Sequence, residues 1–293
     1  MEHLIMYERP ELVQPHLVMG FEGWPDAGRV SSGVITFLRD KLRARRLADV
    51  RPDDFYIVQC AGADVRRPLT DIEGGLVKGL TIPSTSFWFH KAVKGGHDLI
   101  ISHGLEPELS WNRYVDVIVG LAQDFGVERL LTVGGTYDAV PHTAEPVISA
   151  VLSHAGLKEE MTEYGIGFTA YEGPSSIHTA LVVAAGRKGI KAASLWGHVP
   201  QYIHVPNAKV CYAILRRLTG MLDIAVDLDD MRKASEYLDE QVSKALGEKT
   251  QLSEYVAKLE EEYAKGRGEA GELRAEDIIK DVEDFLRKGK HED

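Results

Sequence analysis

The feature that most constrains the fold is an alternation of short apolar runs with longer amphipathic segments, which continues up to about residue 222. Short apolar runs bounded by turn residues are typical of buried strands, and apolar residues at helical spacing are typical of amphipathic helices. Regular alternation of the two predicts a mostly parallel sheet with helices on both faces. The expected fold is therefore an α/β/α sandwich over residues 1–225, with a mostly parallel sheet between two layers of helices.

The individual elements follow from the same pattern. Strands are expected at 4–7, 17–21, 55–60, 99–102, 129–133, 167–171 and 192–196. Helices are expected at 27–42, 110–125, 147–154, 177–188 and 207–222. The alternation is interrupted at 62–98, which contains a pair of arginines, paired glycines, two prolines and an aromatic run at 87–89. One or two antiparallel edge strands are expected there.

The amino-acid composition changes after Asp227, where the chain becomes rich in Glu, Lys, Ala and Leu. Residues 226–293 are expected to form an acidic helical extension, with helices at 229–247, 250–265 and 273–288. The glycine-bearing segment 266–271 predicts a flexible linker before the last helix. That helix has an apolar stripe that includes Ile278, Val282 and Phe285, which must dock on its own body or on a neighbour. A homo-oligomer with contacts from these helices and docking of the helix on its own body are both expected outcomes.

Composition excludes several classes of partner. The 293 residues have a net charge of −11 and no basic patch that would contact phosphates, so nucleic acid is not an expected partner. The sequence has no apolar run of the roughly 18 residues that a membrane span requires, and its first residues do not resemble a signal peptide. The two cysteines, Cys60 and Cys211, are expected to be free thiols in a cytoplasmic protein.

The usual catalytic signatures are absent. There is no phosphate-binding loop of the G-x-x-x-x-G-K-[ST] type, no G-x-G-x-x-G after a strand, no H-E-x-x-H and no paired C-x-x-C. No cofactor and no metal ion are expected from these patterns.

Four polar junctions rich in glycine nevertheless follow predicted strands, at 20–28, 133–143, 171–178 and 196–202. In an open α/β sheet such turns lie beyond the carboxyl ends of the strands, where ligands usually bind. Asp138 and His178 are expected at the same rim. The residues expected to form a crevice there are Glu22, Trp24, Asp26, His142, Glu172, Ser175, His198 and Tyr202.

Structural roles also explain the same residues. Asp26 and Ser175 are suited to cap helix N-termini, and the glycines permit left-handed turns or close packing of helices on strands. The histidines at 142, 178 and 198 could bind a metal ion together with Glu172, but their spacing matches no ligand signature. Glu22 and Asp26 place negative charge at the first turn, which disfavours a phosphate ligand there.

The ordered set of motifs resembles the proteasome assembly chaperone 2 family, particularly its bacterial branch. The motifs are GFEGWPDAG at 20–28, VPHT at 140–143, YEGP at 171–174, ASLWGHVPQY at 193–202, EYVAKLE at 254–260 and DFLR at 284–287. The resemblance implies a three-layer α/β/α domain like that of nucleoside phosphorylases and related hydrolases, followed by C-terminal helices. It also implies oligomers and no established catalytic residues. For eukaryotic and archaeal relatives it implies a chaperone role in assembly of the proteasome core particle.

Two features differ from the family pattern. Some proteasome-binding relatives end in a hydrophobic residue, a tyrosine and one further residue, whereas this chain ends in Lys290-His291-Glu292-Asp293. Docking through such a tail is therefore not expected. Ser175 and Ser176 also replace a Thr-Gly pair that bacterial relatives often have after Gly-Pro.

Two functions of different classes remain open. The favoured one is a non-enzymatic assembly chaperone or interaction protein, whose partners are copies of itself, proteasome subunits or another client. Its contact surface would be the rim of turns or the aromatic stretch 87–89. The alternative is an enzyme of the phosphorylase or hydrolase kind, in which Trp24 stacks on a small molecule and Glu172, His142 and His198 serve as acid, base or orienting groups.

Overall fold

The computed structural model describes residues 3–57, 67–92, 96–247 and 250–265. Within them lies a nine-stranded sheet with the strand order β1-β3-β6-β7-β2-β8-β11-β9-β10. Its strands are β1 (Leu4–Met6), β2 (His16–Glu22), β3 (Arg45–Val50), β6 (Ser86–His90), β7 (Leu99–Leu105), β8 (Arg129–Asp138), β9 (Ile148–Leu152), β10 (Gly167–Phe168) and β11 (Lys191–Pro200).

The centre of the sheet is parallel. Strands β7, β2, β8 and β11 run in one direction, whereas β6, β3 and β1 continue the sheet on one side through antiparallel pairings and β9 does so on the other. The helices are α1 (Val30–Lys41), α2 (Trp111–Asp124), α3 (Lys158–Glu163), α4 (Ile177–Arg187), α5 (Ala208–Met221), α6 (Asp229–Gly247) and α7 (Thr250–Ala264).

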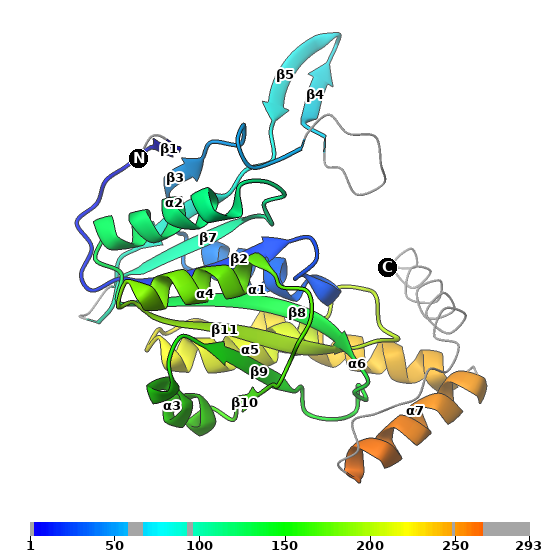
Figure 1. Ribbon diagram of the computed structural model, residues 1–293. Coiled ribbons are helices and arrows are strands. Elements are labelled where there is room, and N and C mark those ends of the chain that lie inside the picture. Colours follow the sequence, from blue (N-terminus) through cyan, green and yellow to red (C-terminus); the bar gives the residue numbers. More distant parts are fainter. Residues whose placement is uncertain (1–2, 58–66, 93–95, 248–249, 266–293) are drawn as a thin grey trace.

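Helices cover both faces of the sheet. In Figure 1, α2 and α4 lie in front of the sheet and α1 and α5 lie behind it. Each pair of helices closes its own apolar core, because alternate residues of every buried strand point to opposite faces. Leu17 and Met19 of β2 thus pack towards α2 and α4, and Val18 packs towards α1 and α5. The predicted α/β fold with a mostly parallel sheet and helices on both of its faces is confirmed.

Two predicted elements are wrong. Residues 147–154 were expected to form a helix, but β9 lies there and pairs with β11. An apolar run this short does not distinguish helix from strand by periodicity, and the free edge of β11 decides the outcome. Residues 55–57 were expected to begin a strand, but Phe55 belongs to a turn, Tyr56 follows it, and both are buried. Residues 58–60 lie outside the described part of the chain. The strand nearby in the sequence is β3 instead. It was not predicted because it begins with the exposed Arg45 and Arg46, which interrupt the apolar pattern.

The aromatic stretch at 87–89 is also placed differently from the prediction. It belongs to β6, which lies inside the sheet between β3 and β7. Phe87 and Phe89 are buried, and the guanidinium groups of Arg39 and Arg46 cover the Trp88 ring. This stretch is therefore not the exposed contact surface that was expected.

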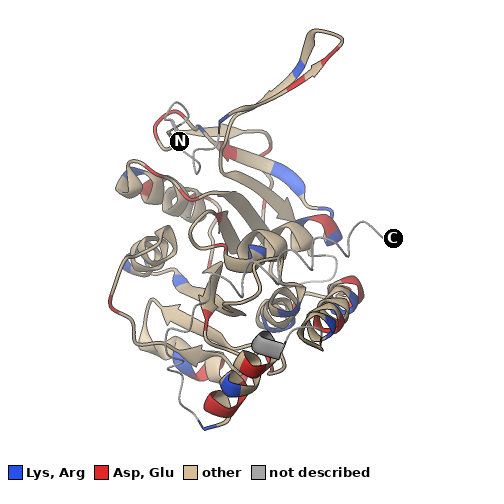
Figure 2. Cartoon of the chain, turned by 90° about the vertical axis from the view of Figure 1, so that its right-hand side faces the viewer, with Lys and Arg blue, Asp and Glu red and all other residues tan. Residues whose placement is uncertain are grey.

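A separate hairpin carries the exposed apolar residues of this region. Strands β4 (Leu69–Glu73) and β5 (Leu76–Thr81) pair only with each other among the described residues, and all their residues are exposed. The hairpin projects away from the body in the views of both Figure 1 and Figure 2. Figure 2 also shows few charged residues along it.

The C-terminal helices α6 and α7 dock on the α/β body of the same chain. Leu238 and Val242 of α6 and Val256 and Leu259 of α7 form an apolar cluster with Tyr202 and Ile203, which follow β11. Lys209 of α5 also forms an ion pair with Asp239 of α6, at 2.8 Å between Nζ and Oδ2. The predicted last helix at 273–288, its stripe and the linker before it lie outside the described residues. The division into a core at 1–225 and an extension at 226–293 stays a prediction.

Candidate functional site

The polar turns gather at one edge of the sheet. Strands β2, β8 and β11 are parallel and adjacent, so the turns that follow them share the carboxyl edge. The turn at 171–178 reaches this edge differently, because β10 pairs in parallel with β9 and therefore runs against β11. It leads into α4, whose first amide, that of Ile177, donates to Glu106 Oε1 at 2.8 Å just beyond the end of β7.

Trp24 is an exposed aromatic residue of the first turn. The residue is 63% exposed, and its ring meets that of Trp196 edge to face, with 6.4 Å between the centroids. Trp196 in turn packs against the buried ring of His178. The backbone of this turn is held to β8, because the Gly135 amide donates to the Pro25 carbonyl at 2.8 Å. The side chain of Trp24 is therefore presented to solvent from a fixed backbone.

Asp26 is the most perturbed carboxyl group of the site. Its Oδ1 accepts a hydrogen bond from the Ser32 amide at 3.0 Å, so it caps the first turn of α1 from six residues away. Burial raises the pKa of Asp26 to about 6, more than its hydrogen bonds lower it. Asp26 and Glu22 line an open depression of about 790 Å³, which Asn207 and Met231 also border. A carboxyl group with a pKa raised towards neutrality is suited to exchange protons, or simply to cap a helix.

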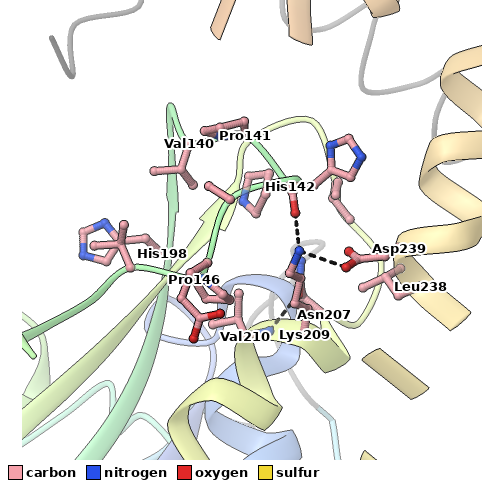
Figure 3. Close-up of a pocket in the computed structure, with 15 residues that line it drawn as sticks. Val140, Pro141, His142, Pro146, His198, Asn207, Lys209, Val210, Leu238 and Asp239 are labelled. Atoms are coloured by element: carbon pink, nitrogen blue, oxygen red, sulfur yellow. Dashed lines mark hydrogen bonds and ion pairs between the residues drawn. The ribbon is translucent and has the colours of Figure 1, made fainter. Parts of the chain in front are cut away.

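His142 and Tyr202 form a second, buried cluster. Figure 3 shows His142 with Lys209, which contacts it from α5, and with Asp239 of α6, which pairs with Lys209. Tyr202 Oη accepts a hydrogen bond from the His142 amide and makes another with His142 Nδ1, both at 2.7 Å. Burial lowers the pKa of His142 and raises that of Tyr202. Lys209 donates to the His142 carbonyl while its ammonium group is paired with Asp239. This cluster thus attaches the 140–143 turn to α5 and α6.

The cavity beside this cluster is small. It lies between the 140–147 segment and α5, is lined by His142 and His198, and has a volume of about 20 Å³. A cavity needs roughly 10–15 Å³ to hold one water molecule. There is room for a water molecule beside the two histidines but not for a substrate.

His198 belongs to a hydrogen-bonded chain across three strands. Its Nδ1 lies 2.6 Å from Asp138 Oδ2, and its Nε2 lies 2.8 Å from Ser149 Oγ. Asp138 is oriented by the Ala139 amide, and its bond to His198 holds the pKa of its carboxyl below the usual value. A serine, a histidine and an aspartate in this order form the proton relay of serine hydrolases. Ser149 was not among the predicted site residues, because its segment was expected to be a helix.

The remaining predicted residues lie apart from these clusters. Glu172 and Ser175 are exposed on the segment between β10 and α4, and the Ser175 hydroxyl donates to the Ser176 carbonyl at 3.3 Å. Neither residue lines the depression at Asp26 or the cavity at His142. The structure thus distributes the eight predicted residues over the Asp26 turn, the His142–Tyr202 cluster, the His198 relay and this exposed segment. That any of them acts on a ligand stays a prediction.

The fold and the polar edge together define a class, that of α/β proteins with three layers, a projecting hairpin and a helical C-terminal extension. The model of the PAC2 family matches residues 20–246, and the chain belongs to this family. None of the helices among the described residues combines the length and the apolar character needed to cross a membrane.

Solved structures agree with this assignment. A PAC2 family protein from Streptomyces avermitilis is 30% identical, with a TM-score of 0.74 over 83% of this chain and 99% of that one. A proteasome-assembly chaperone homologue from Mycobacterium tuberculosis is 26% identical, with a TM-score of 0.73 over 82% and 99% of the two chains. An archaeal proteasome activator from Pyrococcus furiosus, 21% identical with a TM-score of 0.63 over 82% and 97%, shares the fold. No curated protein matches the sequence.

Proposed function

We propose that this PAC2 family protein is a chaperone-like assembly factor that acts by binding other proteins, as a homo-oligomer in the cytoplasm. Its similarity to a proteasome-assembly chaperone homologue supports this class of function. Proteasome subunits are the first clients to test. Catalysis at His142 and His198 is not part of the proposal, because the cavity beside them holds no more than a water molecule.

The observation that carries the proposal is the hairpin β4–β5. Leu69, Ile72, Leu76, Val77 and Leu80 are each at least 60% exposed on it. An isolated two-stranded hairpin is marginally stable in water, and a contiguous exposed apolar patch usually marks a site of protein association. A hairpin held away from the body with its apolar side chains in solvent therefore fits a surface that is covered by another protein.

The test removes apolar surface while preserving strand geometry. Replacing Ile72, Val77 and Leu80 together by threonine keeps a β-compatible side chain at each position but makes it polar. We expect this variant to have a lower mass than the wild-type oligomer, approaching that of the 32.5 kDa chain. It should also bind proteasome subunits more weakly, and the melting temperature of its α/β body should be unchanged. Light scattering and pull-down with purified subunits measure these effects.

The matched control is Val13→Thr, which alters an equally exposed apolar residue on the body, outside the hairpin. It should leave mass and client binding as in the wild type. If the triple variant keeps both its mass and its client binding, the hairpin is not the contact surface and the proposal is wrong in this respect.

A second candidate function rests on the Ser149–His198–Asp138 relay. In a hydrolase the Ser149 hydroxyl would attack an acyl carbonyl and pass its proton to His198 Nε2, while Asp138 stabilises the imidazolium ion. A fluorophosphonate probe tests this directly, because it labels activated serines. Labelling of the wild type that is lost in both Ser149→Ala and His198→Ala would establish a hydrolase. We expect no labelling, because Ser149 is buried in β9 and the adjacent cavity admits only water.

A further inference from the structure

A cluster of three potential metal ligands lies at the opposite edge of the sheet from the polar turns. His16 is the first residue of β2, and His97 and Glu128 lie two residues and one residue before β7 and β8. These strands are parallel neighbours, so their amino ends bring the three side chains together. One ligand atom from each residue lies within 4.8 Å of the others. We propose that His16, His97 and Glu128 bind a divalent transition-metal ion of the Zn²⁺ type.

The chemistry of the histidines supports this assignment. His16 is 6% exposed, and its buried Nδ1 has no hydrogen-bond partner among the described residues. A buried ring nitrogen without a partner costs free energy, and a metal ion would satisfy it. His97 Nδ1 lies 2.8 Å from the Gln14 carbonyl, which can only accept a hydrogen bond. Nδ1 therefore carries the proton and Nε2 presents its lone pair, the arrangement that backbone carbonyls impose on metal-binding histidines.

The backbone around the cluster is firmly held. The His16 amide donates to the Asp98 carbonyl, and the Glu128 amide donates to the Pro15 carbonyl. The carboxylate of Asp98 accepts the amides of Val13 and Ala92, both at 2.8 Å. The starts of β2, β7 and β8 therefore form one scaffold. An ion bound by one residue from each would connect all three strands and stabilise the folded state.

The surroundings admit an ion from solvent. The three residues line an open depression of about 860 Å³, which Gln123 and Asp223 also border. The charge of Arg129, next to Glu128, is compensated by two hydrogen bonds to Glu160 at 2.5 and 3.0 Å. Two histidines and one glutamate leave a fourth position of a tetrahedral zinc ion open for water.

One rearrangement is required. The rings of His16 and His97 are stacked, with 4.1 Å between the centroids and 19° between the planes. Lone pairs in two nearly parallel planes cannot converge on one ion, so one ring must turn. His97 is the partly exposed partner and can turn by giving up its hydrogen bond to the Gln14 carbonyl, whereas His16 is enclosed.

Titration of the chelator-treated full-length protein with Zn²⁺ alone tests the proposal. We expect one ion bound per chain and a melting temperature that rises with Zn²⁺ concentration. Affinity should fall at least tenfold in His97→Gln and in Glu128→Gln, two positions accessible enough for both variants to fold. Visible absorption of Co²⁺ in place of Zn²⁺ should show tetrahedral coordination in the wild type and lose it in both variants.

The control His154→Gln changes an exposed histidine on another part of the surface and should bind Zn²⁺ as the wild type does. The proposal is overturned if the wild type binds no Zn²⁺ at millimolar concentration. It is also overturned if His97→Gln and Glu128→Gln bind as tightly as the wild type, because the ion would then be held elsewhere. Neither result bears on the hairpin, which is tested by mass and client binding.

Discussion

Between pH 8 and pH 5, the unfolding free energy of the wild type is expected to fall by about 2 kcal/mol more than that of His178→Leu. His178 is fully buried on α4, between the rings of Phe21 and Trp196. Burial lowers the pKa of His178 from 6.5 to about 3, so the folded protein excludes a proton that the unfolded chain binds. The stability that neutral His178 contributes is present above pH 6.5 and is lost as the pH falls towards 3, by about 1.4 kcal/mol per pH unit.

The measurement is the difference in unfolding free energy between wild type and His178→Leu in urea at pH 8, 6.5 and 5. Taking the difference cancels the contributions of the other titrating groups. One of them, Asp26, changes the unfolding free energy in the opposite direction. The pKa of Asp26 is raised from 3.8 to about 6, so its protonation favours the folded state as the pH falls through 6. Leucine at the exposed position His154 is the control and should leave the pH dependence unchanged. A wild-type advantage that does not shrink on acidification would show that folded His178 accepts protons from solvent.

Gly135→Ala is expected to destabilise the protein by about 1–3 kcal/mol, the usual effect of an overpacked core. A Cβ atom at Gly135 would lie 2.4 Å from the Ala27 carbonyl oxygen and 3.0 Å from Val30 Cβ. The first contact is with backbone, so a side-chain rotation cannot relieve it. The 24–28 turn would have to move away from β8, and Trp24 would move with it. Urea unfolding and tryptophan fluorescence of the folded state measure the two effects.

Gly120→Ala is the matched control. Gly120 lies within α2, and a Cβ atom there would meet no heavy atom within 4 Å. Alanine inside a helix is favoured over glycine by roughly 1 kcal/mol, so this variant should be more stable than the wild type. Equal stability of Gly135→Ala and wild type would mean that the 24–28 turn is not packed tightly on β8. Gly135 would then have no steric role in holding this turn.

The hydrophobic pattern determined the order of most strands and helices and the edge at which the polar turns meet. Periodicity is a local property, and the carboxyl ends of parallel strands must share an edge, so both could be read without knowing any contact. The segments that became β2, β7, β8 and β11 are buried on both faces and are apolar throughout much of their length. Such strands are recognisable in isolation.

Only the tertiary structure decided which polar residues meet. Ser149 contacts His198 because β9 pairs with β11, and that pairing makes a strand of a short apolar run whose periodicity does not distinguish helix from strand. His16, His97 and Glu128 are far apart in the chain and meet because β2 lies between β7 and β8. The burial of Phe87 and Phe89 likewise depends on β6 entering the sheet, while the apolar side chains of β4–β5 remain in solvent. Strand neighbours are chosen by packing over the whole domain, and no local pattern of residues specifies them.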